Sequence, residues 1–182
     1  MKERPIIFSG EMVSAIISGR KTMTRRVVKQ SLPIGTRWYG VVEDELCYRI
    51  VDSKSVNTLC KCPYGQVSDR LWVRETYNIE INLSNREKAV CYRADEDVPF
   101  GWKPSIFMPR WASRITLEIT NIKVEQLQDI TEKDAKAEGC QQSATHSCRE
   151  KFAGLWDSIN GKKHPWASNP WVWVIEFQKV KP

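Results

Sequence analysis

Two residues that could do chemistry together lie near the N-terminus, within Gly19-Arg20-Lys21-Thr22-Met23-Thr24-Arg25-Arg26. Lys21 precedes Thr24 by three residues, and a neutral lysine can take the proton of a threonine hydroxyl and so create a nucleophile. That role requires the lysine pKa to fall well below its usual value of about 10.4, which burial in a cleft can achieve. The spacing therefore predicts Lys21 and Thr24 as a candidate catalytic pair.

A candidate third member is the carboxylate of Glu75, which ends the segment Leu71-Trp72-Val73-Arg74-Glu75. The alternation of this segment is typical of a β-strand and places Glu75 on the inward face, beside Leu71 and Val73. A carboxylate on such a face needs a cationic or hydrogen-bonding partner. We expect Glu75 to orient Lys21 or to pass a proton to a leaving amine, while backbone amides or Arg74 stabilise an oxyanion.

The same residues have a purely structural interpretation. In it, Lys21 and Glu75 form a buried ion pair that holds a helix end to the sheet, and Thr24 is an ordinary strand residue. The cations Arg25 and Arg26, with Lys29, likewise either hold phosphates at the mouth of a cleft or form a solvated strand face. Residue types alone leave both interpretations open.

The composition predicts a single soluble globular domain over residues 1–182, with 41% hydrophobic and 27% charged residues. A net charge of +6 and a pI near 9.0 favour anionic partners. Clustered cations and eight tryptophans favour nucleic acid in particular, because arginines hold phosphates and bases stack on aromatic rings. Trp102, beside Lys103 in a predicted covering loop, is the leading candidate for stacking.

Several classes of protein are disfavoured by the sequence. No apolar run approaches membrane-spanning length, and the first residues lack the apolar core of a signal peptide, so we expect a cytoplasmic protein without a membrane partner. The six cysteines are expected to be reduced thiols. They do not form a recognisable pair of ligand pairs, so neither a metal nor another cofactor is expected.

Short strands and about three helices predict an α+β fold built on a curved or closed sheet. Ser9 and Gly19 are expected to bound the first helix, and capping residues at Thr131 and Ser147 to begin two more. Strands are expected at residues 6–8, 71–77, 89–93, 114–124 and 171–177, with a possible hairpin at 37–50 around Glu43-Asp44-Glu45. The remainder of 78–110 is expected to be a long loop that covers a site.

Longer motifs carry a resemblance to a known family. Gly-Arg-Lys-Thr-x-Thr-Arg-Arg at residues 19–26 and Gly-x-x-x-Asp-Arg-Leu-Trp-Val-Arg-Glu-Thr at 65–76 resemble ASCH domains, above all the longer ASCH proteins of bacteriophages and prophages. The similarity extends over nearly the whole chain, including residues 108–114 and 169–174. It implies a small β-barrel of the PUA-like superfamily, with insertions near 31–64 and 78–105.

The resemblance also implies a function. PUA-like domains bind RNA or modified bases in a cleft on the barrel. A small bacterial ASCH protein is an amidohydrolase that removes the acetyl group from N(4)-acetylcytidine. Its catalytic lysine, threonine and glutamate correspond to Lys21, Thr24 and Glu75.

The sequence thus predicts a protein that binds RNA, a nucleoside or a modified base, and that hydrolyses an amide if Lys21, Thr24 and Glu75 are catalytic. The expected binding residues are Arg20, Thr22, Arg25, Arg26, Arg74, Trp102 and Lys103. The alternative is a non-catalytic module of phage origin that binds nucleic acid or protein. A phage-encoded protein of this kind would act in the cytoplasm of the bacterial host.

Overall fold

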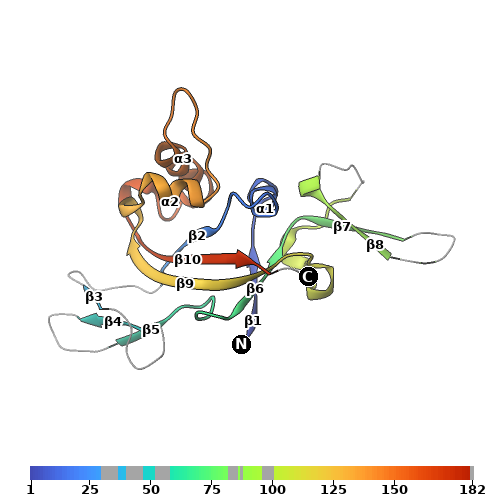
Figure 1. The fold of residues 1–182 in the computed structure, drawn as a ribbon, viewed down its shortest axis with the longest axis horizontal. Coiled ribbons are helices and arrows are strands. Elements are labelled where there is room, and N and C mark those ends of the chain that lie inside the picture. Colours follow the sequence, from blue (N-terminus) through green and yellow to red (C-terminus); the bar gives the residue numbers. More distant parts are fainter. Residues whose placement is uncertain are drawn as a thin grey trace.

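A computed structural model describes residues 1–29, 37–39, 47–51, 58–81, 86, 88–95 and 101–180 (Figure 1). The strands are β1 (Glu3–Ile7), β2 (Met23–Val27), β3 (Arg37–Tyr39), β4 (Cys47–Val51), β5 (Thr58–Lys61), β6 (Arg70–Arg74), β7 (Tyr77–Ile81), β8 (Lys88–Tyr92), β9 (Thr116–Gln126) and β10 (Trp171–Lys179). The α-helices are α1 (Gly10–Ile17), α2 (Glu132–Ala137) and α3 (Cys148–Asn160). Short 3-10 turns include Ser105–Phe107 and Arg110–Ala112.

A five-stranded sheet in the order β1-β6-β9-β10-β2 forms the body of the molecule. Only β1 and β6 run parallel; the other neighbours pair antiparallel. The predicted α+β class is confirmed, with the long strands β9 and β10 strongly curved (Figure 1). Within the described residues no ladder joins the edge strands β1 and β2, so the sheet is curved and open, whereas the resemblance implied a closed barrel.

Alternation along β10 divides the core between the two faces of this sheet. Trp173 and Ile175 pack in one cluster that includes Val13 of α1, whereas Val174 packs in a second cluster with Phe152 of α3. Each fully buried apolar side chain of this size contributes about 1.5–3 kcal/mol. Strand β10 therefore contributes to both clusters, one with residues of α1 and the other with residues of α3.

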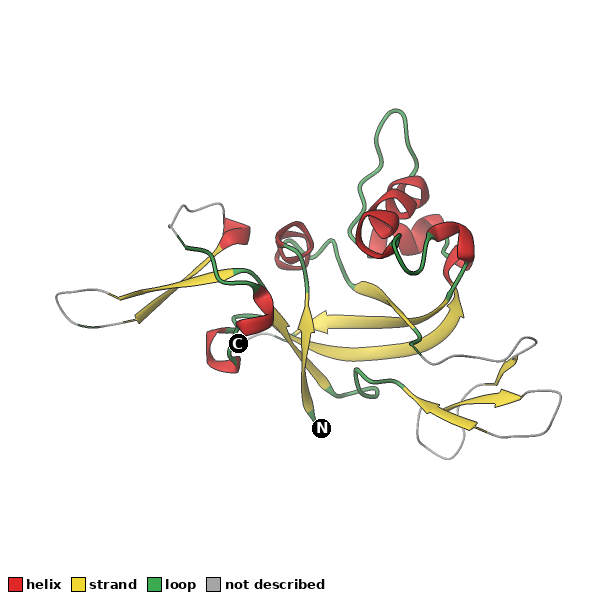
Figure 2. Ribbon diagram, turned by 180° about the vertical axis from the view of Figure 1, so that it is seen from behind, coloured by secondary structure: helices red, strands yellow, loops and turns green. Residues whose placement is uncertain are grey.

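Two smaller β-structures extend from this body (Figure 2). Strands β3, β4 and β5 form an antiparallel sheet, which confirms a hairpin at 37–50, although its turn at Glu43-Asp44-Glu45 lies outside the described residues. Strands β7 and β8 form a second hairpin. Strand β8 confirms the strand predicted at 89–93, whereas β7 lies where a loop was predicted, so the loop is wrong for residues 78–81. Tyr77, Ile79 and Ile81 alternate with polar residues, and this period of two is typical of a strand.

The predicted helix starts are confirmed for α2 and α3. Thr131 and Ser147 both form capping boxes with the acidic residue three positions later. Ser9 occupies the N-cap of α1 as predicted, but its side chain makes no capping hydrogen bond. None of the helices in the described part of the chain is long and apolar enough to cross a bilayer.

Candidate nucleic-acid interface

Helix α1 ends at the left-handed glycine that the sequence predicts, and this turn directs the chain toward the site. Gly19 has a φ of 74°. Its N–H donates to the Ile16 carbonyl at 3.1 Å, and the N–H of Arg20 donates to the Ala15 carbonyl at 2.9 Å. These two bonds form a Schellman motif, after which Lys21 turns inward.

Helix α2 ends in the same way and brings its last residues against Lys21. Gly139 has a φ of 98°, and the N–H of Cys140 donates to the Ala135 carbonyl at 3.1 Å. A Cβ at position 139 would lie 3.3 Å from Cβ of Lys21 and 3.2 Å from that of Ala15. Because glycine has no Cβ, it permits both the left-handed backbone and the close approach of the two helix ends.

The carboxylate that meets Lys21 is Glu138, not Glu75. Nζ of Lys21 donates to Oε2 of Glu138 at 2.7 Å and to the Glu138 backbone carbonyl at 2.8 Å. Both side chains are buried, with exposed fractions of 1% and 4%. The cation thus neutralises a buried acid and also satisfies a carbonyl at a helix C-terminus, where positive charge is favourable.

Burial lowers the pKa of Lys21 below its usual value of 10.5, while the charge and hydrogen bond of Glu138 oppose this shift. A lowered lysine pKa is a property that a general base needs. Yet the ammonium group is directed at Glu138, and the structure records no hydrogen bond or ion pair between Lys21 and Glu75. The observed contacts of Lys21 are therefore those of a member of an ion-pair network.

Arg25 extends this network. Its side chain has no exposed surface, and it contacts three carboxylates, those of Glu125, Asp134 and Glu138. The guanidinium also lies 5.9 Å from the centre of the Phe152 ring. A buried cation with this many acidic partners is neutralised within the protein. We infer that Arg25 joins β2 to α2 and β9 and has little charge left for a ligand.

Glu75 belongs to a separate ion-pair network. Its two carboxylate oxygens accept from Arg114 at 3.0 and 3.1 Å, and Arg114 also donates to Asp95 at 2.6 Å. Burial raises the pKa of Glu75, and the hydrogen bonds from Arg114 oppose the rise. The inward position of Glu75, with 1% exposure, and its need for a cationic partner are confirmed. The structure makes that partner Arg114.

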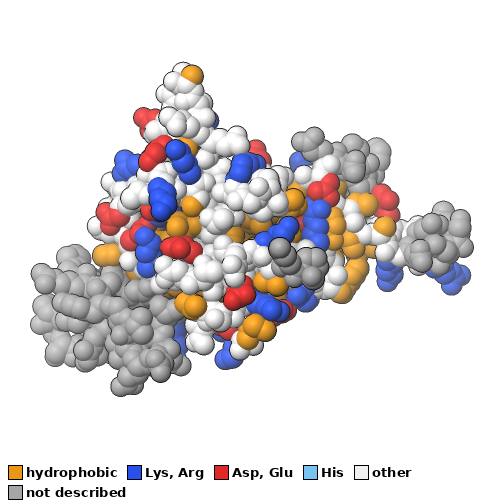
Figure 3. Space-filling view, viewed as in Figure 1, with side chains coloured by type: hydrophobic (Ala, Val, Ile, Leu, Met, Phe, Trp, Pro, Cys, Tyr) orange, Lys and Arg blue, Asp and Glu red, His pale blue; other side chains and the backbone are white. Residues whose placement is uncertain are grey.

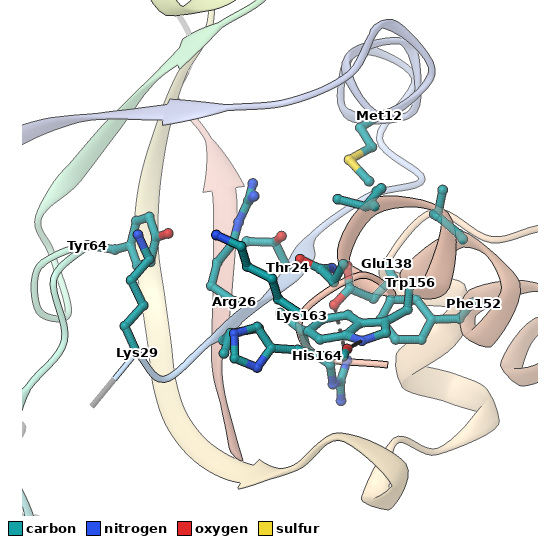
Figure 4. A pocket seen from close by; sticks show the side chains of 15 residues that line it. Met12, Thr24, Arg26, Lys29, Tyr64, Glu138, Phe152, Trp156, Lys163 and His164 are labelled. Atoms are coloured by element: carbon teal, nitrogen blue, oxygen red, sulfur yellow. Dashed lines mark hydrogen bonds and ion pairs between the residues drawn. The ribbon is translucent and has the colours of Figure 1, made fainter. Parts of the chain in front are cut away.

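A cavity of about 300 Å³ lies beside β2 (Figure 4). Strand β2 and the residues after it form one wall, and α3 with the segment after it forms the other; Met12, Tyr64 and Glu138 complete the lining. The β2 side contributes Thr24, Arg25, Arg26, Val27 and Lys29, and the α3 side contributes Phe152, Leu155, Trp156, Ile159, Asn160, Lys163 and His164. Aromatic rings thus lie at the two ends of the cavity shown in Figure 4, with polar groups between them.

Arg26 lines this cavity in a very different state from its neighbour Arg25. It donates to the Ile7 carbonyl at 2.7 Å and lies 5.1 Å from the centre of the Phe8 ring. Its Nε is buried without a hydrogen-bond partner, and no carboxylate of the described residues forms an ion pair with it. Burial lowers the pKa of this guanidinium, while the charge of Glu138 opposes the shift.

The remaining predicted binding residues are dispersed. Arg20 lines an adjoining cavity of about 480 Å³, and Thr22 is exposed with its backbone bonded to Ala137 and Phe177. Arg74 donates to the Met108 carbonyl at 3.1 Å and lies over Trp72. Trp102 and Lys103 lie beside β7, where Lys103 bridges to Tyr77. Neither lines the three cavities around β2.

Sequence reasoning missed Glu138, Tyr64, Lys163 and Arg114 as members of these sites. A signal for Glu138 exists, because an acidic residue at a helix C-terminus faces the negative end of the helix dipole. Such an acid, directly before the helix-ending Gly139, indicates a cation nearby. The residues around Tyr64 and around Lys163 contain no comparable signal. Among the described residues, no group of three or more histidines, cysteines or acids is arranged to hold a metal ion.

No known family and no curated protein matches this sequence. Among solved structures, the chain is similar to an ASCH domain from Lactobacillus crispatus JV V101, with 11% identity, a TM-score of 0.44, and coverage of 98% of this chain and 79% of that one. A DUF984 protein from Enterococcus faecalis V583 gives 9% identity, a TM-score of 0.44, and coverage of 99% and 81%.

Proposed function

We propose that this protein binds RNA, a nucleoside or a modified base in the cavity beside β2. The observation that carries the proposal is a cavity of about 300 Å³ that combines aromatic rings with cations that form no ion pair with any acid in the described residues. The volume is at the lower end of the range for small-molecule sites, and aromatic walls with a few polar groups are typical of them. Bases stack on such rings, and phosphates pair with such cations.

The charge balance of the cavity supports an anionic ligand. Glu138 is the acidic residue on its wall, and that carboxylate is already shared by Lys21 and Arg25. Arg26, Lys29 and Lys163 line the cavity without forming ion pairs within the described residues. Over α2 and α3, by contrast, the face drawn in Figure 3 mixes cationic and acidic side chains. The excess of positive charge is therefore a property of the cavity.

A pair of variants of equal exposure tests the proposal. Ile159 lines the cavity and is 57% exposed, whereas Ile81 is 55% exposed on the β7–β8 hairpin. Ile159→Trp should fill the cavity mouth without disturbing the core, and Ile81→Trp is its control. In anisotropy titrations with a short single-stranded RNA, Ile159→Trp should weaken binding about tenfold, since stacking one base is worth about 1–3 kcal/mol. Equal affinities for both variants would contradict the proposal.

Amide hydrolysis is a second candidate function. It is favoured by the buried Thr24, which lines the cavity, and by the lowered pKa of Lys21. In this reaction neutral Lys21 takes the hydroxyl proton, and Oγ of Thr24 attacks the acyl carbon of the amide. The C–N bond breaks as the amine leaves with the proton, and water then hydrolyses the threonine ester. Glu138 holds Lys21 in this scheme, while Glu75 stays paired with Arg114.

Release of cytidine and acetate from N(4)-acetylcytidine measures this second function. We expect Lys21→Ala and Thr24→Val to abolish turnover, because they remove the base and the nucleophile. Glu75→Gln should leave most of the turnover if Glu138 is the carboxylate that orients Lys21. Full activity of Lys21→Ala would rule out Lys21 as the base. No turnover by the wild-type protein would rule the reaction out and leave binding as the function.

A further inference from the structure

The cavity beside β2 is the middle one of three that adjoin one another. On one side it shares Met12, Glu138 and Leu155 with a cavity of about 480 Å³ that lies between α1 and α3. On the other side it shares Val27, Lys29 and Tyr64 with a cavity of about 340 Å³. Because neighbouring cavities share wall residues, they adjoin one another in a series that runs from the space between α1 and α3 past β2.

Every cavity in this series carries positive charge. Arg20 and Lys151 line the first, Arg26 and Lys163 the second, and Lys29 and Lys61 the third. No ion pair engages Arg20, Lys151, Arg26, Lys163 or Lys29 within the described residues. The acidic residues on these walls are Glu11 in the first cavity and the neutralised Glu138. Cations thus recur along the series, while unpaired acids do not.

We propose that the three cavities form one track for a single strand of RNA about three nucleotides long, with a base in the middle cavity and the phosphates along the cations. The inference rests on the proposed function and selects its ligand: a strand with several phosphates, in place of a free nucleoside. A nucleoside would occupy the middle cavity and leave Arg20 and Lys151 of the first cavity without an anionic partner.

Arg26 is the central phosphate contact in this arrangement. Its buried Nε has no hydrogen-bond partner, although a buried guanidinium N–H group normally has one. Lys29, by contrast, lines both the middle cavity and the outer one, so a phosphate there would connect two nucleotides. Arginines and lysines in such positions supply the salt-dependent part of nucleic-acid affinity.

Affinity as a function of ligand length tests the track. Calorimetric titrations would use cytidine, cytidine 5′-monophosphate, and 5′-phosphorylated oligocytidylates of two to six nucleotides. We expect affinity to rise by about tenfold or more from one to three nucleotides, because added phosphates gain charge-assisted contacts. Beyond about three nucleotides it should level off, because the ligand then extends past the track.

Lysine variants locate the outer contacts. Lys151 lines the first cavity, and Lys151→Met should weaken the trinucleotide several-fold while leaving the mononucleotide within about twofold. Lys163→Met should weaken both ligands. Lys162, exposed and adjacent but not part of a cavity wall, provides the control Lys162→Met, which should change neither.

The outcomes separate this inference from the proposed function. If the mononucleotide binds as tightly as the trinucleotide, or Lys151→Met weakens both equally, the track is wrong while the single binding cavity stands. If no ligand in the series binds, both proposals fail. A rise to three nucleotides together with the selective effect of Lys151→Met supports the track.

Discussion

Arg25 and Arg26 are neighbours on strand β2, and the difference between them separates structure from function in this protein. Arg25 has no exposed side-chain surface and contacts three carboxylates. Arg26 lines the same cavity but forms no ion pair with an acid in the described part of the chain. A cation that its own fold neutralises stabilises that fold, whereas one without a partner is available to an anionic ligand.

Substitutions in the ion-pair network around Arg25 should lower the unfolding free energy more than substitutions around Arg26. Glu138→Gln would leave Lys21 and Arg25 buried with less negative charge around them. Breaking a buried pair in this way costs about 3–5 kcal/mol of unfolding free energy. Urea unfolding measures the loss, and Glu125→Gln, which alters a carboxylate that is 14% exposed, should cost less.

A double variant sharpens this result. Lys21→Met together with Glu138→Leu removes both charges of the pair. Replacing a buried ion pair by apolar residues of similar size is often neutral or stabilising. The double variant should therefore be more stable than either single variant, and a simple sum of the two losses would show that the pair is not coupled.

Replacing each of the two arginines by methionine compares their contributions to stability and to RNA binding directly. Arg25→Met should lower the unfolding free energy by about 3 kcal/mol or more, because three carboxylates each lose one cationic partner. Arg26→Met should lower it by less than about 1 kcal/mol, since it breaks no ion pair with a described residue. RNA affinity should fall about tenfold for Arg26→Met. Equal losses of stability would contradict the contrast.

The helix end that holds Glu138 against Lys21 should tolerate little change. Gly139→Ala forces a left-handed backbone on alanine and places a Cβ 3.3 Å from that of Lys21, so we expect a loss of about 1–2 kcal/mol. Gly154, inside α3 with open space around it, provides a control of opposite sign. Gly154→Ala should stabilise the protein by about 0.5–1 kcal/mol in the same unfolding assay.

The pH dependence of stability gives the smallest expected effect. Lys21 loses its proton at a lower pH in the folded protein than in the unfolded chain, where its pKa is near 10.5. Between these two values the unfolded state binds more protons, so the contribution of Lys21 to stability rises with pH. Subtracting the unfolding free energies of Lys21→Met removes the other titrating groups. A difference that falls with pH would contradict the lowered pKa.

Local signals in the sequence were sufficient for much of the scaffold. The glycine that ends α1, the capping boxes of α2 and α3, and the inward position of Glu75 each depend on a few consecutive residues. Sequence reasoning also found Thr24, Arg25 and Arg26, which all line the cavity. The scaffold features follow from backbone conformation and period, whereas the three cavity residues were selected by residue type, spacing and the family resemblance.

The partners of the charged residues could not be predicted in this way. Lys21 pairs with Glu138 across 117 positions, and Glu75 pairs with Arg114 across 39. Such pairs depend on which helices and strands meet in space. The hydrophobic period of one segment carries no information about this. The sequence required a cation for Glu75 and offered Lys21, but the fold supplied Arg114 instead.

The most direct test of the account is the location of bound nucleotide on the protein. Amide chemical-shift changes in a ¹⁵N–¹H spectrum, followed while the cytidine trinucleotide is titrated, would measure it. We predict that the largest changes cluster at Arg26, Lys29, Tyr64 and Lys163, around the cavity beside β2. Changes confined to the β7–β8 hairpin or to the turn at Arg110–Ala112, or no changes at all, would contradict it.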